Sequence, residues 1–140
     1  MKLLISFKNL SEFDNDIVKY IDILDLKDPE KGSIGPWISD DIITVVKKYK
    51  KKKKISATIG DISSNKILLN KLTNFDNLGL DYIKFAFFSE NISALEKLIN
   101  DIGGKKFQTK LVFVVFVDEP KVLEFVDENL DLLKKNKLNF

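Results

Sequence analysis

Short apolar runs of the kind that form buried strands alternate along this chain with segments whose apolar residues recur every three or four positions. This alternation repeats five times. It is typical of βα units, in which helices connect the parallel strands of one sheet. The sequence therefore predicts an α/β fold, with strands over residues 3–6, 21–27, 55–60, 82–87 and 111–117.

The segments between these runs carry signals for the start of a helix. Ser11, with Asp14 three residues later, resembles a capping box, and Ser39 is a suitable N-cap for the next helix. Pro120 stands where a last helix would begin, and that helix would extend through Leu133. No linker separates the units, so we expect residues 1–140 to form a single domain.

Length and composition agree with one folded unit. The 140 residues are 44% apolar, which is enough for one compact domain and too little for two. No run reaches the roughly 18 apolar residues of a membrane span, and the apolar stretch at the start is interrupted at Lys8. We therefore expect no signal peptide, no membrane partner and a cytoplasmic location.

The residue types that the chain lacks exclude several chemistries. It has no cysteine and no histidine, which removes disulfides, thiolate chemistry and the commonest transition-metal sites. All 23 basic residues are lysines, and 21 acidic residues reduce the net charge to +2. Without arginine there is no bidentate recognition of phosphate or guanine. We expect no nucleic-acid partner, no metal and no cofactor.

Lysines dominate residues 47–54, where only Tyr49 interrupts them. Such a run could bind an anionic surface partner. We favour a simpler interpretation, in which the lysines lie at the end of a helix, where the helix dipole stabilises cations, and extend into water.

Polar residues are placed on one face of the predicted sheet. Neighbouring side chains of a strand point to opposite faces, so each strand divides into two sets. In three neighbouring strands one set is apolar and suited to packing under helices. The other set carries Asp25, Lys27, Ser56, Thr58 and Lys84. Lysine and aspartate are rarely buried unless they are paired.

Two hypotheses explain this polar face. In the first, a lysine in a restricted site forms an imine with a carbonyl compound, and Asp25 or a hydroxyl group relays protons. In the second, Lys27 and Lys84 lie at strand ends and extend into water, and Asp25 is an ordinary ion-pair partner. The alternation of residues does not decide between them.

The loop after the second strand, residues 28–35, contains several turn residues. Gly32 and Ser33 could let backbone amides approach a phosphate, as in anion-binding nests. The loop has no P-loop or dinucleotide-binding fingerprint, and a plain turn with Pro29 and Gly35 explains the same residues.

Four ordered motifs follow one another along the chain: DLKDPEKGSIG at 25–35, PW at 36–37, SATIGD at 56–61 and DYIK at 81–84. Together they resemble the (5-formylfuran-3-yl)methyl phosphate synthase family, also called 4-(hydroxymethyl)-2-furancarboxaldehyde-phosphate synthase.

The resemblance implies a TIM-type barrel that acts in methanofuran biosynthesis. It implies a lyase that joins two molecules of glyceraldehyde 3-phosphate into a phosphorylated furan aldehyde, with loss of phosphate and water. By the same resemblance Lys27 forms a Schiff base with the substrate, Lys84 accepts a proton and Asp25 assists. The residues that we expect to contact the substrate are Ser56, Thr58, Gly32 and Ser33.

The number of repeats bears on the fold. Five units in 140 residues are about three fewer than the eight of a TIM barrel, which typically has about 250 residues. We therefore expect a partial TIM-type barrel of five βα units, which is a homo-oligomer or pairs with a complementary C-terminal half through its open edges. The alternative is a five-stranded doubly wound, flavodoxin-like sheet. The chain would then be a binding or receiver-like module, or a non-catalytic remnant of the enzyme.

Overall fold

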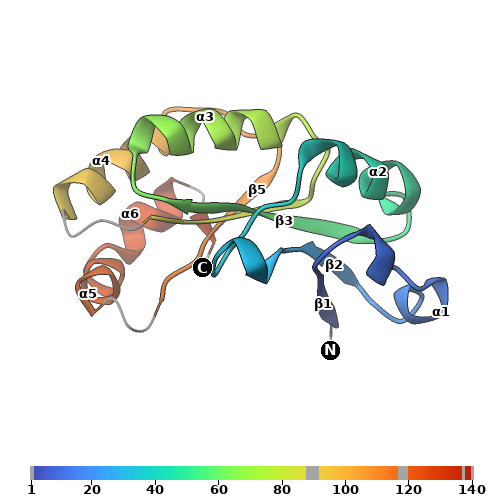
Figure 1. Cartoon of the computed structure of the whole chain (residues 1–140). Coiled ribbons are helices and arrows are strands. Elements are labelled where there is room, and N and C mark those ends of the chain that lie inside the picture. The colour runs from blue at the N-terminus through green and yellow to red at the C-terminus, as the bar shows by residue number, and fades with distance from the viewer. Residues whose placement is uncertain (1, 88–91, 117–119, 137, 140) are drawn as a thin grey trace.

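The computed structural model describes residues 2–87, 92–116, 120–136 and 138–139. Within these residues six strands form one sheet in the order β1-β2-β3-β4-β5-β6, and every neighbouring pair is parallel. Figure 1 shows the arrangement. The strands are β1 Leu4–Phe7, β2 Ile23–Leu26, β3 Lys54–Ile62, β4 Tyr82–Phe87, β5 Lys110–Phe113 and β6 Leu138–Asn139. The predicted α/β class is confirmed.

Helices alternate with the strands. The α-helices are α1 Asn15–Val18, α2 Ser39–Tyr49, α3 Asn65–Asp76, α4 Ile92–Gly103, α5 Pro120–Glu128 and α6 Leu130–Lys135. Two single 3₁₀ turns, η1 Leu10–Glu12 and η2 Pro29–Lys31, follow β1 and β2. Within the described residues, no helix combines the length and the apolar character needed to cross a membrane.

Three details of the predicted elements were wrong. The cap of α1 is Asp14 itself, whose carboxylate accepts from the Asp16 N–H, and Ser11 lies inside η1. Ser39 is the first residue of α2 and makes no side-chain cap. The last predicted helix is two helices, which meet at Asn129, where the backbone leaves the helical conformation with φ −118° and ψ 24°.

The fifth predicted strand is shorter than expected and a sixth was missed. β5 ends at Phe113, where residues 111–117 were expected to form the strand, and residue 117 lies outside the described residues. β6 has only two residues. A strand of that length carries no alternation by which the sequence could reveal it.

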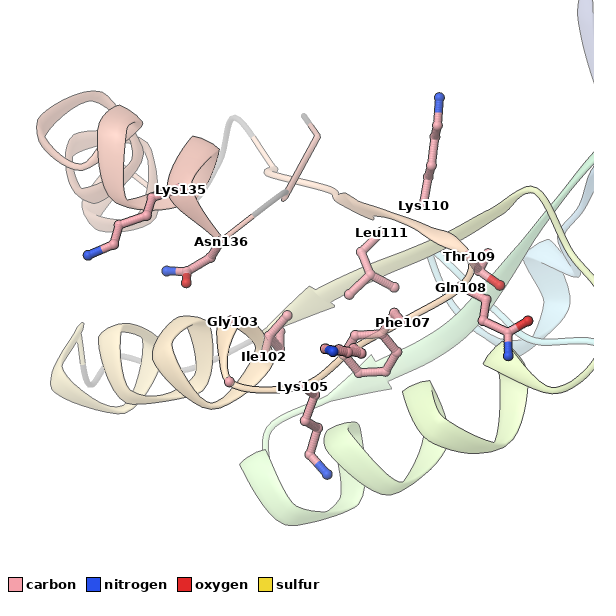
Figure 2. A pocket seen from close by; sticks show the side chains of 12 residues that line it. Ile102, Gly103, Lys105, Phe107, Gln108, Thr109, Lys110, Leu111, Lys135 and Asn136 are labelled. Carbon is pink, nitrogen blue, oxygen red and sulfur yellow. The ribbon is translucent and has the colours of Figure 1, made fainter.

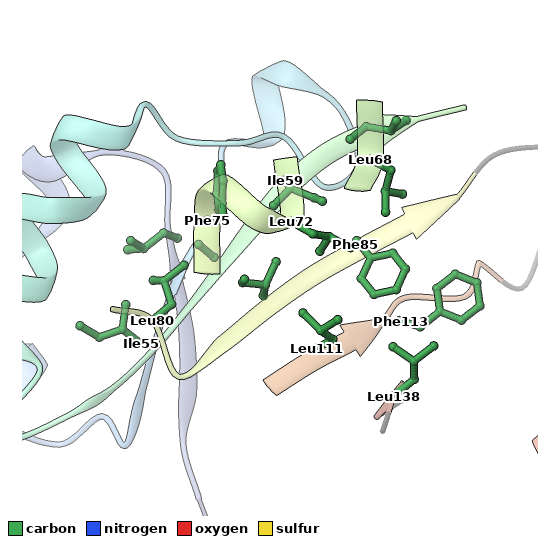
Figure 3. Close-up of a cluster of buried hydrophobic side chains, with 14 of the residues drawn as sticks. Ile55, Ile59, Leu68, Leu72, Phe75, Leu80, Phe85, Leu111, Phe113 and Leu138 are labelled. Atoms are coloured by element: carbon green, nitrogen blue, oxygen red, sulfur yellow. The ribbon is translucent and has the colours of Figure 1, made fainter. Parts of the chain in front are cut away.

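The core lies on one face of the sheet. Ile55, Ala57 and Ile59 of β3 are fully buried, and they form one cluster with apolar side chains from all six helices. Up to a bulge in β3, the strand residues of this cluster belong to a single alternating set. Figure 3 shows part of the cluster, with Leu68 of α3 above Phe85 and Leu111 of the strands. The helices therefore pack against one face, and the other face carries the polar residues.

The bulge in β3 changes how the chain continues beyond the sheet. The pairing with β4 shifts between Thr58 and Asp61, and Gly60 has a φ of 94°. A side chain at this position would be strained by the backbone, and its Cβ would lie 3.3 Å from Pro36 Cδ. Gly60 thus allows the segment after η2 to pack closely against the end of β3.

The lysine run after α2 makes specific contacts in addition to its exposure to water. The Lys53 ammonium donates to the carbonyls of Lys19 and Ile21, at 2.9 and 2.6 Å. Lys50 and Lys54 form ion pairs with Asp81, at 2.7 and 2.9 Å. The run therefore connects the end of α2 to the loops at the amino ends of β2 and β4.

Candidate functional site at the polar face of the sheet

A buried carboxylate lies at the centre of the polar face. Asp25 of β2 is fully buried, and its Oδ2 accepts from Ser6 Oγ at 2.8 Å and from Lys84 Nζ at 2.6 Å. Ser6 and Asp25 are direct neighbours across β1 and β2. Lys84 comes from β4, so its side chain extends across β3 to reach the carboxylate. Three strands thus contribute one connected polar group.

The burial of this ion pair is uneven. The Asp25 side chain is 1% exposed and the Lys84 side chain 20% exposed. A charge removed from water requires a partner of opposite charge, and Lys84 supplies it. The Lys84 side chain is thus the more exposed member of the pair.

Two buried polar atoms next to the ion pair are unsatisfied. Asp25 Oδ1 and Ser56 Oγ have no hydrogen-bond partner within the described part of the chain, and the two residues are direct neighbours across β2 and β3. Buried polar atoms are normally paired. A group that both accepts and donates, such as a hydroxyl, matches this carboxylate oxygen and serine hydroxyl.

Lys27 directly follows β2 and is half-buried. Its N–H donates to the carbonyl of Phe7 at 3.1 Å, which fixes the backbone. By the alternation of the strand its side chain lies on the same face as Asp25. Among the described residues its ammonium nitrogen has no hydrogen bond or ion pair, so it is the unpaired amine of the group.

The loop that follows Lys27 is closed on itself. The Asp28 N–H donates to the carbonyl of Gly35 at 2.9 Å. The Asp28 carboxylate accepts from Lys31 Nζ at 2.9 Å and caps η2 through the Glu30 N–H at 3.1 Å. The hydrogen bond from Lys31 lowers the pKa of Asp28, with smaller help from the Glu30 N–H. The loop therefore has a fixed shape at the carboxyl end of β2.

The predicted substrate contacts occupy different surroundings. Gly32 has a φ of 111°, and a Cβ there would lie 2.6 Å from Asp61 Oδ2. Ser33 is exposed, whereas Ser56 and Thr58 are buried. The Thr58 hydroxyl is bonded within the protein, to the carbonyl of Gly35 at 2.7 Å. Contacts of these residues with a substrate remain predictions.

Ser6 is the member of the polar group that the sequence reasoning missed. It occupies the third position of β1 and, by alternation, lies on the same face as Asp25. Applying the division into two faces to the first strand would have identified it.

A separate cavity of about 550 Å³ lies at the amino end of β5, away from the predicted site residues. Residues 102–111 and 135–136 line it, and Figure 2 shows Lys105 and Lys110 extending in opposite directions from it. The cavity contains no residue of the polar group. In the described part of the chain, no group of three or more acidic side chains is arranged to hold a metal ion.

Comparisons with known proteins match most of this chain. The sequence model of a family described as 4-HFC-P synthase matches residues 3–137. The (5-formylfuran-3-yl)methyl phosphate synthase of Methanococcus aeolicus is 30% identical over 132 residues, which are 87% of this chain and 54% of that protein. The protein of the same name from Methanopyrus kandleri is 26% identical over 133 residues, 86% of this chain and 54% of that protein.

A third relative matches a shorter segment more closely. The (5-formylfuran-3-yl)methyl phosphate synthase of Archaeoglobus fulgidus is 42% identical over 65 residues, 44% of this chain and 27% of that protein. The chain thus spans at most about half the length of these curated relatives.

Proposed function

Because the chain belongs to the 4-HFC-P synthase family, we propose that it forms a lysine imine with a triose phosphate in the synthesis of (5-formylfuran-3-yl)methyl phosphate. The substrate is glyceraldehyde 3-phosphate, and the product serves methanofuran biosynthesis. One observation carries the proposal. Lys27 is half-buried and has no partner among the described residues, and by alternation it lies on the same face as the buried ion pair of Asp25 with Lys84. Within the same residues, the Asp25 carboxylate keeps one unsatisfied oxygen.

The proposed fold of the family domain is a TIM-type barrel, of which this chain forms part. The strictly sequential order of parallel strands and the packing of the helices on one face support it. A doubly wound sheet differs in both respects, because its strand order reverses and its helices cover both faces. In the proposed assembly, β1 and β6 are edges that pair with a second copy or with a complementary C-terminal half.

The first chemical step is imine formation. The neutral amine of Lys27 attacks the aldehyde carbon of glyceraldehyde 3-phosphate, and the resulting carbinolamine loses its hydroxyl group as water. Lys84, held in place by Asp25, donates the proton that this hydroxyl needs in order to leave. The nitrogen lone pair of Lys27 then forms the C=N bond.

The second step is proton abstraction. The imine makes the hydrogen on the neighbouring carbon acidic, because the electron pair of the C–H bond can move into the C=N system. Lys84, now neutral, accepts that proton, and the substrate becomes an enamine that can attack a second aldehyde. The same ion pair thus serves as acid and then as base, with Asp25 as the fixed counter-charge.

Trapping the imine tests this function. The protein is incubated with glyceraldehyde 3-phosphate and sodium borohydride, and the modified lysine is located by mass spectrometry. We expect the adduct at Lys27 and its loss in Lys27→Met. Lys66→Met is the matched control, because Lys66 is an exposed lysine of α3. Labelling spread evenly over exposed lysines would contradict imine catalysis and favour a binding module.

A further inference from the structure

The hydroxyl group of Thr58 joins β3 to the loop that starts after Lys27. Thr58 is fully buried, and its Oγ1 lies 2.7 Å from the carbonyl oxygen of Gly35 and 3.3 Å from that of Leu26. The hydroxyl has one hydrogen, and the shorter distance assigns it to Gly35. The bond connects residues that are 23 positions apart in the sequence.

The acceptor of this bond is the atom that closes the loop. The Gly35 carbonyl also accepts the Asp28 N–H at 2.9 Å, so one oxygen holds both the first residue of the loop and the strand beside it. This close approach requires a glycine, because a Cβ at position 35 would lie 2.0 Å from the Asp28 carbonyl oxygen. On its other side Lys27 is held by the bond from its N–H to Phe7.

We propose that Thr58 is a positioning residue, which clamps the loop at residues 28–35 and thereby holds Lys27 facing the Asp25–Lys84 pair. The effect of Thr58 on imine formation rests on the proposed function. The clamp, by which its hydroxyl holds the loop at residues 28–35 to β3, does not. Removing the hydroxyl leaves a buried carbonyl with one donor fewer and frees the loop from β3. Misplacing a reacting group by about 1 Å can cost roughly a hundredfold in rate.

The protein contains its own probe of the clamp. Trp37 is the single tryptophan of the chain, is 5% exposed and comes two residues after Gly35. The Pro36 ring between them lies against the position that a Gly60 side chain would occupy. Loosening of the loop will therefore expose Trp37, which acrylamide quenching of its fluorescence measures.

The test compares Thr58→Val with Thr58→Ser, which keeps the hydroxyl, and with Thr73→Val. Thr73 is the matched control, because its hydroxyl also donates to a backbone carbonyl, that of Leu69 at 2.9 Å, but on the exposed side of α3. We expect Thr58→Val to raise the quenching constant of Trp37 severalfold. We also expect it to slow borohydride trapping at Lys27 about tenfold or more at saturating aldehyde. The other two variants should stay within about twofold of the wild type.

The two measurements, Trp37 quenching and trapping at Lys27, distinguish failure of the clamp from failure of the proposed function. If the wild type traps no aldehyde at Lys27, the proposed function fails, and Trp37 quenching alone still decides the clamp. If Thr58→Val exposes Trp37 but traps at the wild-type rate, the clamp is structural only and the positioning role is overturned. Unchanged values of both measurements overturn the clamp as well.

A measurement on the wild type covers the case in which Thr58→Val does not fold. The clamp requires the Asp28 amide, bonded to Gly35, to exchange its hydrogen as slowly as the amides of β2. Exchange of that amide at the rate of an open loop would overturn the inference.

Discussion

Two of the carboxylates that form ion pairs with lysines, Asp81 and Asp25, lie in or directly before the strands on either side of β3 and differ in how completely they are bonded. Asp81 directly precedes β4 and is paired with Lys50 and Lys54. Asp25 lies within β2 and is paired with Lys84. Both side chains are largely buried, with 12% of Asp81 and 1% of Asp25 exposed.

Every oxygen of Asp81 has a partner. Oδ1 accepts from Lys54 at 2.9 Å, and Oδ2 accepts from the Ile55 N–H at 3.0 Å as well as from Lys50 at 2.7 Å. Asp25, the more deeply buried of the two, has both its partners on Oδ2 and none on Oδ1 within the described residues. A buried charge stabilises the fold only when all of its oxygens have hydrogen-bond partners. From this comparison we expect a structural role for Asp81 and a functional role for Asp25.

The largest expected effect comes from removing the functional pair as a whole. In Asp25→Asn combined with Lys84→Met no charge stays buried, so we expect the free energy of unfolding to change by only about 1 kcal/mol. Loss of the proton-transfer group should slow exchange of the hydrogen at C2 of glyceraldehyde 3-phosphate for deuterium by about 10²- to 10⁴-fold. Urea unfolding and NMR measure the two quantities.

Lys84→Met alone is the informative control for this prediction. It leaves the Asp25 carboxylate buried without its counter-charge, which should cost about 3–5 kcal/mol of stability. If the double variant is destabilised as much as the single one, the pair is structural, and the contrast with Asp81 fails.

Asp81→Asn should show the opposite pattern. The variant keeps the shape of the side chain but loses its charge-assisted hydrogen bonds, so we expect the free energy of unfolding to fall by about 2 kcal/mol. Deuterium exchange into the substrate should stay at the wild-type rate. Asp16→Asn is the matched control, since its ion pair with Lys19 is exposed and should contribute less than about 1 kcal/mol. A slower exchange in Asp81→Asn would place Asp81 in the functional site.

The pH dependence of stability provides a finer test of Asp81. Burial alone would raise its pKa, but hydrogen bonds from Lys50, Lys54 and the Ile55 N–H lower it below the ordinary value. A lowered pKa means that the carboxylate stabilises the fold fully above the pKa of an unfolded aspartate, about 3.9. This stabilisation is lost as the pH falls through the folded value.

The measurement compares urea unfolding of the wild type and Asp81→Asn between pH 7 and pH 3. Their difference in free energy should be constant from pH 7 to about pH 5 and should shrink below about pH 4. A difference that stays the same down to pH 3 would show that the ionised form of Asp81 is not the source of the stability.

The alternation of residues predicted most of the fold, because every buried strand keeps its apolar set on the helix side. Ile55, Ala57 and Ile59 show this most clearly. The interruption between α5 and α6 could not be predicted in this way, because Asn129, where the backbone leaves the helical conformation, is neither a proline nor a glycine. The position of η1 likewise depends on a local cap, Asn9.

For the site, alternation placed Asp25 and Lys84 on one face, and the structure shows them in contact at 2.6 Å. Alternation could not show which oxygen is unsatisfied, or that the Thr58 hydroxyl is directed to the loop and not outward. Both depend on the register of the strands and on the path of the loop, which arise from contacts between distant residues. The roles of these residues in catalysis remain predictions.

The smallest expected effect concerns Ser6, which shares Asp25 Oδ2 with Lys84. Ser6 is exposed, so water can replace its hydroxyl in Ser6→Ala, and we expect a loss of about 0.5–1 kcal/mol in stability. Among the described residues the carboxylate then keeps only Lys84 as a partner, and deuterium exchange at C2 should slow about two- to threefold, since a smaller fraction of the ion pairs keeps the productive orientation. Ser63→Ala, an exposed serine after β3, is the control for both measurements. If Ser6→Ala exchanges at the wild-type rate, Lys84 alone orients Asp25, and the functional group consists of the ion pair without the serine.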